Sequence, residues 1–124
     1  VIQLENKDKW TGFHNACENG QIEVVQFLMQ EDSKVLQQKN KFESTGFHHA
    51  CENGEIEVVE FLMKEDPTVL HVKDQNKETG FQRAIFNDKN DVVNFLMKED
   101  PTVLQTNVVH FAQEREEKEK QERE

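Results

Sequence analysis

The sequence predicts an all-α solenoid of stacked helix-turn-helix units joined by hairpin-like connections. A segment that begins Thr-Gly-Phe recurs at residues 11, 45 and 79, at a constant interval of 34 residues. Each copy contains two short runs in which the apolar residues follow a helical spacing, and a glycine or proline ends each run in most copies. A fixed period of this size indicates one supersecondary unit that packs against copies of itself.

The first helix of each unit is predicted to be short. In the first copy, Phe13, Ala16 and Cys17 have the spacing i, i+3, i+4, which places them on one helix face. Thr11 is a suitable N-cap because its hydroxyl oxygen can accept a backbone N–H of the first turn. The Asn-Gly pair at residues 19–20 should end the helix, since glycine readily adopts the left-handed backbone found after helix ends.

A second helix is predicted from about Gln21 to Glu31. It is apolar on nearly all sides, which predicts burial between neighbouring units. In the second and third copies an Asp-Pro-Thr-Val-Leu segment follows, and its proline ends the helix. The aspartate and the proline also suit the N-cap and the first position of a further single turn. The polar residues that lead to the next unit are expected to form an extended or hairpin-like connection.

The repeat pattern divides the chain into five segments. These are the end of a truncated upstream repeat at 1–10, repeats at 11–44, 45–78 and 79–106, and a charged helix at 107–124. The apolar residues at the start of the first segment are in register with the Val-Leu pairs of the later copies, so we expect the chain to be part of a longer array. In the last segment, Glu and Lys four residues apart favour a helix that caps the third repeat or projects from it.

Charge and composition argue against several function classes. The formal net charge of −10 opposes binding to nucleic-acid phosphates and favours a partner protein with a basic surface. No apolar run approaches the roughly 20 residues of a membrane helix, so we expect no membrane partner. The two cysteines occupy equivalent positions in successive copies and do not suggest a disulfide framework, which favours an intracellular, cytoplasmic location.

The repeated motif Thr-Gly-Phe-His-x-Ala-Cys-x-Asn-Gly-x-Ile-Glu-Val-Val-x-Phe-Leu-Met resembles the ankyrin repeat, whose pattern opens Thr-Pro-Leu-His-x-Ala. The resemblance covers about residues 1–104. The sequence departs from the family pattern at Gly12, Gly46 and Gly80, where proline is usual, and at the hairpin tip, which lacks the usual glycine. Tetratricopeptide repeats also have a period of about 34 residues, but they need two long helices and a different motif.

The His and Cys residues of the first helices raise the question of a zinc site. His14 with Cys17, and His48 with Cys51, are i, i+3 pairs. Packed helices lie about 8–10 Å apart, however, whereas zinc ligands lie about 2.0–2.3 Å from the ion, so each unit offers only two ligands. The resemblance implies instead that the histidine bonds to the threonine and to the neighbouring backbone. No nucleophile with a base and an orienting group is visible, so we expect neither catalysis nor a cofactor.

Acidic pairs recur at the end of each second helix, where the helix dipole disfavours negative charge. Their members are Glu31, Asp32, Glu65, Asp66, Glu99 and Asp100. We expect the aspartates to cap the turn that follows. The alternative is a calcium ion held by these carboxylates together with free carbonyl groups at the helix end.

The resemblance implies non-catalytic binding of a partner protein on the concave face formed by the first helices and the connecting tips. The candidate contact residues are Trp10, Glu18, Asn19, Phe42, Glu43, His49, Glu52, Asn53, Lys77, Arg83 and Phe86. Trp10 and Phe42 either pack against a neighbouring hairpin or anchor the partner. The alternative function is structural: self-assembly into homo-oligomers through the repeat ends or the C-terminal helix.

Overall fold

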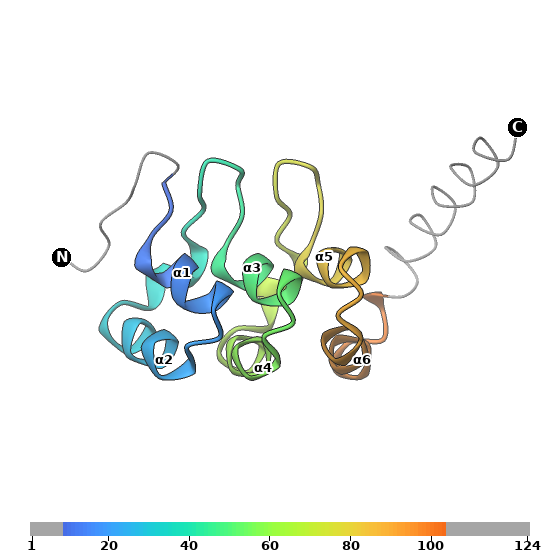
Figure 1. The fold of residues 1–124 in the computed structure, drawn as a ribbon. Helices are drawn as coiled ribbons and strands as arrows, with labels where there is room; N and C mark the ends of the chain where they lie inside the picture. Colours follow the sequence, from blue (N-terminus) through green and yellow to red (C-terminus); the bar gives the residue numbers. More distant parts are fainter. Residues whose placement is uncertain (1–8, 104–124) are drawn as a thin grey trace, which may run out of the picture.

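The computed structural model describes residues 9–103 and has six α-helices and no strand within that range (Figure 1). The helices form three pairs: α1 (Gly12–Glu18) with α2 (Ile22–Glu31), α3 (Gly46–Glu52) with α4 (Ile56–Glu65), and α5 (Gly80–Phe86) with α6 (Asn90–Glu99). The 3-10 helices η1 (Ser33–Gln37) and η2 (Pro67–His71) follow the first two pairs. The predicted all-α solenoid is confirmed. None of the described helices is long and apolar enough to cross a membrane.

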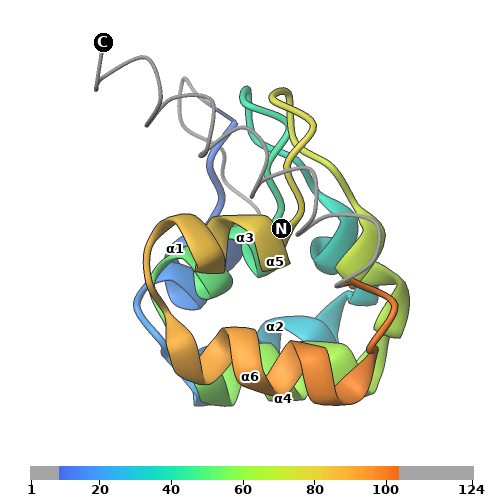
Figure 2. The ribbon, with the colours of Figure 1, turned by 90° about the vertical axis from the view of Figure 1, so that its right-hand side faces the viewer.

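The three helix pairs are stacked side by side in two layers (Figures 1 and 2). The first helices α1, α3 and α5 form one layer, and the second helices α2, α4 and α6 form the other. The hairpin-like connections rise from the layer of first helices, away from the second helices. The predicted C-terminal helix and nearly all of the predicted upstream repeat end lie outside the described residues.

Each first helix begins with a capping box, as the threonine at this position predicts. In α1 the Thr11 hydroxyl accepts the backbone N–H of His14, and the His14 ring accepts the backbone N–H of Thr11 over 3.1 Å. The same pair of contacts recurs in α3. In α5 the Gln82 side-chain oxygen accepts the Thr79 N–H over 2.8 Å, so glutamine keeps the cap that histidine makes elsewhere.

Three asparagines end the first helices as predicted: Asn19, Asn53 and Asn87. Each side-chain amide donates to the carbonyl group four residues earlier, over 2.8–2.9 Å. The next residue then has a positive φ, which is 68° at Gly20, 71° at Gly54 and 57° at Asp88. Aspartate tolerates this left-handed backbone better than most residues do, and this explains its place where the first two copies have glycine.

The connections are hairpin-like, and their tips also adopt a left-handed backbone. The residues with positive φ are Lys9 at 59°, Glu43 at 59° and Lys77 at 64°, where the family pattern has glycine. Neighbouring tips are joined directly, because the Gln75 N–H donates to the Phe42 carbonyl over 3.0 Å. The hairpins therefore form a continuous row above the first helices.

The core lies between the two helix layers, but its extent differs along the stack. Phe13, Phe47 and Phe81 of the first helices are completely buried, and so are Val58 of α4 and Val92 of α6. At the equivalent position of α2, Val24 is 43% exposed, and Phe27 is 54% exposed. The prediction that the second helices are buried on several sides is therefore wrong for one side of α2, which no other described repeat covers.

The glycine at the first position of α3 and α5 is required by the close packing of successive repeats. A Cβ atom on Gly46 would lie 2.7 Å from Cys17 Sγ and 2.9 Å from the Phe13 ring. A Cβ atom on Gly80 would meet the equivalent atoms of the second repeat at 2.8–2.9 Å. At Gly12 no atom lies within 4 Å of such a Cβ. The bulky phenylalanine of one repeat thus excludes the usual proline from the next.

Substitution of Gly46 by alanine should destabilise the protein by about 1–3 kcal/mol, because the added methyl group overpacks the contact with Phe13 and Cys17. Gly12→Ala is the matched control at the equivalent helix position. It should be neutral or stabilising by up to about 1 kcal/mol, because alanine favours the helix and meets open space. Urea denaturation followed by circular dichroism measures both changes. Equal effects of the two substitutions would contradict this explanation.

Candidate functional site

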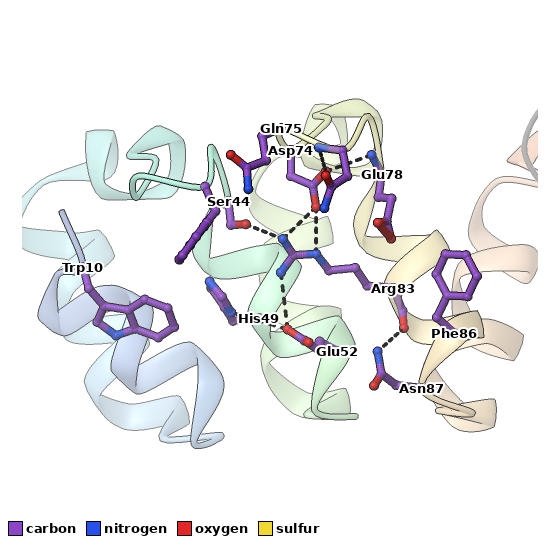
Figure 3. A pocket seen from close by; sticks show the side chains of 12 residues that line it. Trp10, Ser44, His49, Glu52, Asp74, Gln75, Glu78, Arg83, Phe86 and Asn87 are labelled. Atoms are coloured by element: carbon purple, nitrogen blue, oxygen red, sulfur yellow. Dashed lines mark hydrogen bonds and ion pairs between the residues drawn. The ribbon is translucent and has the colours of Figure 1, made fainter. Parts of the chain in front are cut away.

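A cavity of about 330 Å³ lies between the hairpins and the first helices, and we call it the groove (Figure 3). Its lining residues are Trp10, Phe42, Ser44, His49, Glu52, Asp74, Gln75, Asn76, Glu78, Arg83, Phe86 and Asn87. They come from the segment before α1, from two successive hairpins, and from α3 and α5. The groove therefore spans all three repeats on the side of the hairpins.

The groove brings together about half of the predicted contact residues. Those that line it are Trp10, Phe42, His49, Glu52, Arg83 and Phe86. Those that do not line it are Glu18, Asn19, Glu43, Asn53 and Lys77. Among the latter, the two asparagines cap helix ends, and Glu43 and Lys77 take the left-handed conformation at the hairpin tips.

Each of the two hairpins that the structure describes in full is closed by one buried polar side chain that the sequence did not single out. In the first hairpin, Asn40 Oδ1 accepts the backbone N–H of Phe42 over 2.9 Å and that of Ser44 over 3.1 Å. In the second, Asp74 Oδ1 accepts the N–H of Asn76 over 2.8 Å and that of Glu78 over 3.0 Å. These contacts satisfy backbone donors that have no helix or sheet partner. Asn40 and Asp74 occupy the same position in successive repeats, and this equivalence could have identified them from the sequence.

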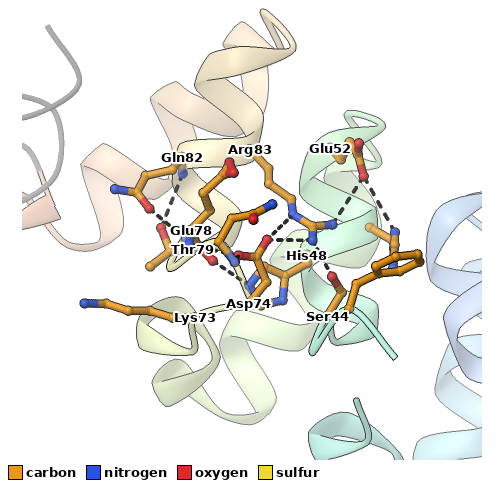
Figure 4. A network of polar contacts seen from close by, with 12 residues as sticks. Ser44, His48, Glu52, Lys73, Asp74, Glu78, Thr79, Gln82 and Arg83 are labelled. Carbon is orange, nitrogen blue, oxygen red and sulfur yellow. Dashed lines mark hydrogen bonds and ion pairs between the residues drawn. The ribbon is translucent and has the colours of Figure 1, made fainter. Parts of the chain in front are cut away.

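The second polar side-chain atom of Asn40 and of Asp74 pairs with the residue nine positions later, as Figure 4 shows for Asp74 and Arg83. In the first hairpin the Asn40 amide donates to His49 Nε2 over 3.1 Å. In the second, Asp74 Oδ2 accepts from Arg83 Nε over 3.1 Å and from Nη2 over 2.7 Å. A neutral amide–imidazole pair in one repeat is thus replaced by a carboxylate–guanidinium pair in the next.

Arg83 joins the second and third repeats across the floor of the groove (Figure 3). Besides Asp74, its guanidinium donates to Glu52 of α3 over 3.3 Å and to the Ser44 hydroxyl of the first hairpin. Burial alone would raise the pKa of Asp74, but the Glu78 N–H and the Arg83 guanidinium outweigh burial and hold it below its ordinary value. Burial and the charge of Asp74 raise the pKa of Glu78.

Two aromatic residues that line the groove, Trp10 and Phe42, are called the aromatic wall, and Trp10 packs against two histidine rings. The Trp10 ring centroid lies 4.3 Å from that of His49 and 5.6 Å from that of His14. The Trp10 indole also donates to the Asn15 side chain over 2.7 Å. Trp10 therefore packs against side chains of α1 and α3 rather than against a neighbouring hairpin, and it also lines the groove.

The buried histidines hold successive repeats together in their neutral form. His14 Nε2 donates to the Ser44 carbonyl over 3.1 Å, and His48 Nε2 donates to the Glu78 carbonyl over 3.0 Å. These are the contacts with the neighbouring backbone that the resemblance implied. Burial and then the charge of Arg83 lower the pKa of His48 to about 4. The same two causes lower the pKa of His49 to about 3.

The aspartates of the acidic pairs at the ends of the second helices act as caps, as predicted. Asp66 accepts the N–H of Thr68 over 3.0 Å, and Asp32 accepts the N–H of Lys34 over the same distance. Asp100 makes the equivalent contact with Thr102. Residues 9–103 contain no group of three or more His, Cys, Asp or Glu side chains that could hold a metal ion.

A comparison with known families found a match over most of the chain. The model of ankyrin repeats (3 copies) matches residues 13–107, a range that covers the three helix pairs to within one residue. A search of curated proteins found no match.

Acidification should destabilise the protein progressively as the pH falls below about 6.5. The unfolded chain takes up protons on histidine near that pH, whereas burial keeps His48 and His49 neutral down to pH values of about 4 and 3. The stability that depends on these neutral rings is therefore complete above pH 6.5 and is lost below it, by about 1.4 kcal/mol per pH unit for each proton. Denaturation in urea between pH 7.5 and 4.5 measures this slope.

The control is the double variant His48→Gln with His49→Asn, which introduces the residues that other repeats have at these positions, Gln82 and Asn15. This variant should show a shallower pH slope than the wild type. His71→Gln, which removes an exposed histidine, should keep the full slope. A full slope in the double variant would contradict the assignment of the pH dependence to the buried rings.

Loss of Arg83 should destabilise the protein by about 2–3 kcal/mol in the variant Arg83→Ala, because it leaves the Asp74 carboxylate buried without its partner. The double variant Asp74→Asn with Arg83→His copies the Asn40–His49 pair of the preceding hairpin. It should recover at least half of the loss. A double-mutant cycle by urea denaturation, with both single variants, measures the coupling. An additive result would show that the two positions do not act as a pair.

Proposed function

The chain belongs to the ankyrin-repeat family, and from this premise we propose that it is a non-catalytic module that binds a partner protein through the groove. Ankyrin repeats are generally protein-interaction modules, and their stacked repeats present an extended surface. The observation that carries the proposal is the convergence of side chains from all three repeats on one cavity. The two free, buried cysteines support a cytoplasmic location.

Most residues that face the groove change between otherwise similar repeats. His49 in the second repeat corresponds to Arg83 in the third, and Glu52 corresponds to Phe86. By contrast, the N-cap threonines and the phenylalanines at the second position of the first helices, which are the same in all three repeats, are buried. The constant residues support the stack, and the variable residues give the groove its chemistry, which fits a specific partner.

Phe42 is the anchor that we propose for the partner. Its ring is 42% exposed, although it belongs to the groove lining. A partner that covers this ring removes apolar surface from water, which contributes about 25 cal/mol per Å². Aromatic residues in the centre of an interface often dominate binding for this reason.

The second candidate function is self-assembly, and the exposed side of α2 favours it. Val24 and Phe27 are exposed there, whereas Val58 and Val92 at the equivalent position of Val24 are completely buried by the preceding repeat. A helix pair from another copy of the chain would cover this side in the way that one repeat covers the next. We regard this as an additional function that does not use the groove.

Phe42→Ala should abolish capture of the partner from an extract of the source cell, whereas Phe27→Ala should retain it. Both substitutions remove an exposed phenylalanine ring, and only the first lies in the groove. Quantitative mass spectrometry of proteins captured on the immobilised chain measures the loss. A partner retained equally by both variants would overturn the proposed role of the groove. Light scattering on the same variants tests self-assembly, which should weaken only in Phe27→Ala.

A further inference from the structure

We propose that the groove receives an extended basic segment of the partner, in which an arginine side chain stacks on the aromatic wall and pairs with the carboxylates. This inference rests on the proposed function and adds the chemistry of the partner to it. Three observations lead to it: the groove is negatively charged, the Arg83 guanidinium already donates to groups of the protein, and Phe42 is exposed.

The charge balance of the groove is negative. The ionisable side chains that line it, apart from His49, are those of Glu52, Asp74, Glu78 and Arg83. Three carboxylates and one guanidinium give the lining a formal charge of −2, and the Lys41 ammonium group over the Phe42 ring offsets one of these charges. His49 adds no positive charge at neutral pH, since burial lowers its pKa to about 3. The negative charge of the groove has the same sign as the net charge of −10 of the whole chain, so both attract a basic segment.

Arg83 is already occupied and does not make the groove a site for anions. Its three guanidinium nitrogens donate to Asp74, Glu52 and Ser44. An acidic or phosphorylated segment would have to displace one of these contacts and would also meet three carboxylates. Among residues 9–103, by contrast, burial and the charges of Asp74, Arg83 and Glu52 act on the Glu78 carboxylate, and no hydrogen-bond donor is among these influences. A guanidinium group from a partner would provide that donor.

The aromatic wall suits a cation. Trp10 and Phe42 both line the groove, and tryptophan binds cations on its face better than the other aromatic residues do. Phe42 already holds one cation, because Lys41 Nζ lies 5.2 Å from its ring centroid. Arginine fits this combination better than lysine, since its planar group stacks on rings and presents several donors to carboxylates at once.

The test uses a synthetic Gly/Ser peptide that carries two arginines, with two matched peptides in which citrulline or glutamate replaces them. Citrulline has nearly the same shape and no charge. Trp10 is the single tryptophan of the chain, so its fluorescence reports directly on the groove. The arginine peptide should change the fluorescence saturably and bind less tightly as the salt concentration rises. The citrulline and glutamate peptides should bind at least fivefold more weakly.

The protein variants separate the groove from the general acidity of the chain. Glu78→Gln should weaken binding of the arginine peptide by about two- to fivefold, as expected for loss of one partly screened ion pair. Glu57→Gln removes the same charge from an exposed position on α4 and should leave binding unchanged. Circular dichroism checks that both variants are folded. Equal binding of the citrulline peptide, no saturable change with arginine, or equal effects of the two variants would overturn the inference.

Selection of displayed random linear peptides distinguishes failure of this inference from failure of the proposed function. Peptides selected on the wild-type chain are tested again on Phe42→Ala. If they lose binding and are enriched in arginine, the inference is supported. If they lose binding without enrichment in basic residues, the inference fails and the proposed function stands. If they bind Phe42→Ala as tightly as the wild type, the groove is not the binding site and both fail.

Discussion

The stack depends on one histidine ring that acts in two repeats at once. In the first and second repeats, Nδ1 accepts from the N-cap threonine of its own helix, and Nε2 donates to a carbonyl group of the following hairpin. The first contact fixes where the helix begins, and the second fixes the height of the next hairpin above it. Because both nitrogens are used, the ring must be neutral with the proton on Nε2. The spacing of the repeats, and hence the position of the groove, follows from this bridge.

A second set of contacts converts the regular stack into a specific surface. The residue that closes each hairpin also orients the residue nine positions later, and the two are matched in charge: Asn40 with His49, and Asp74 with Arg83. The change to a charged pair leaves the closure of the hairpin intact, because Asp74 uses its other oxygen for the backbone. It also allows the long arginine side chain to reach Glu52 in the preceding repeat. A substitution that is conservative for the fold therefore changes the chemistry of the groove.

The sequence was sufficient to predict the features that depend on local contacts and that recur at a fixed interval. The period, the helix pairs, the threonine caps and the breaks at Asn-Gly and Asp-Pro all belong to this class. Other features depend on residues brought together only by folding. The proline-to-glycine departure at Gly46 has its cause in Phe13 and Cys17 of the previous repeat. Asp74 looked like an ordinary polar hairpin residue, and its partner Arg83 could be identified only once the hairpin lay over α5. Helical periodicity likewise could not show that one side of α2 is exposed.

The charge of the groove comes from residues that differ between repeats, whereas the buried histidines contribute none at neutral pH. Burial keeps His48 and His49 uncharged at neutral pH, so the charge of the groove is set by three carboxylates and one arginine. Histidine is the side chain whose ordinary pKa lies between pH 6 and 8, and burial keeps the groove's own histidine, His49, neutral there. Recognition of a basic segment should consequently respond to salt and hardly at all to pH within that range. The pH sensitivity of the protein resides in its stack, because the rings that become protonated are those that hold successive repeats together.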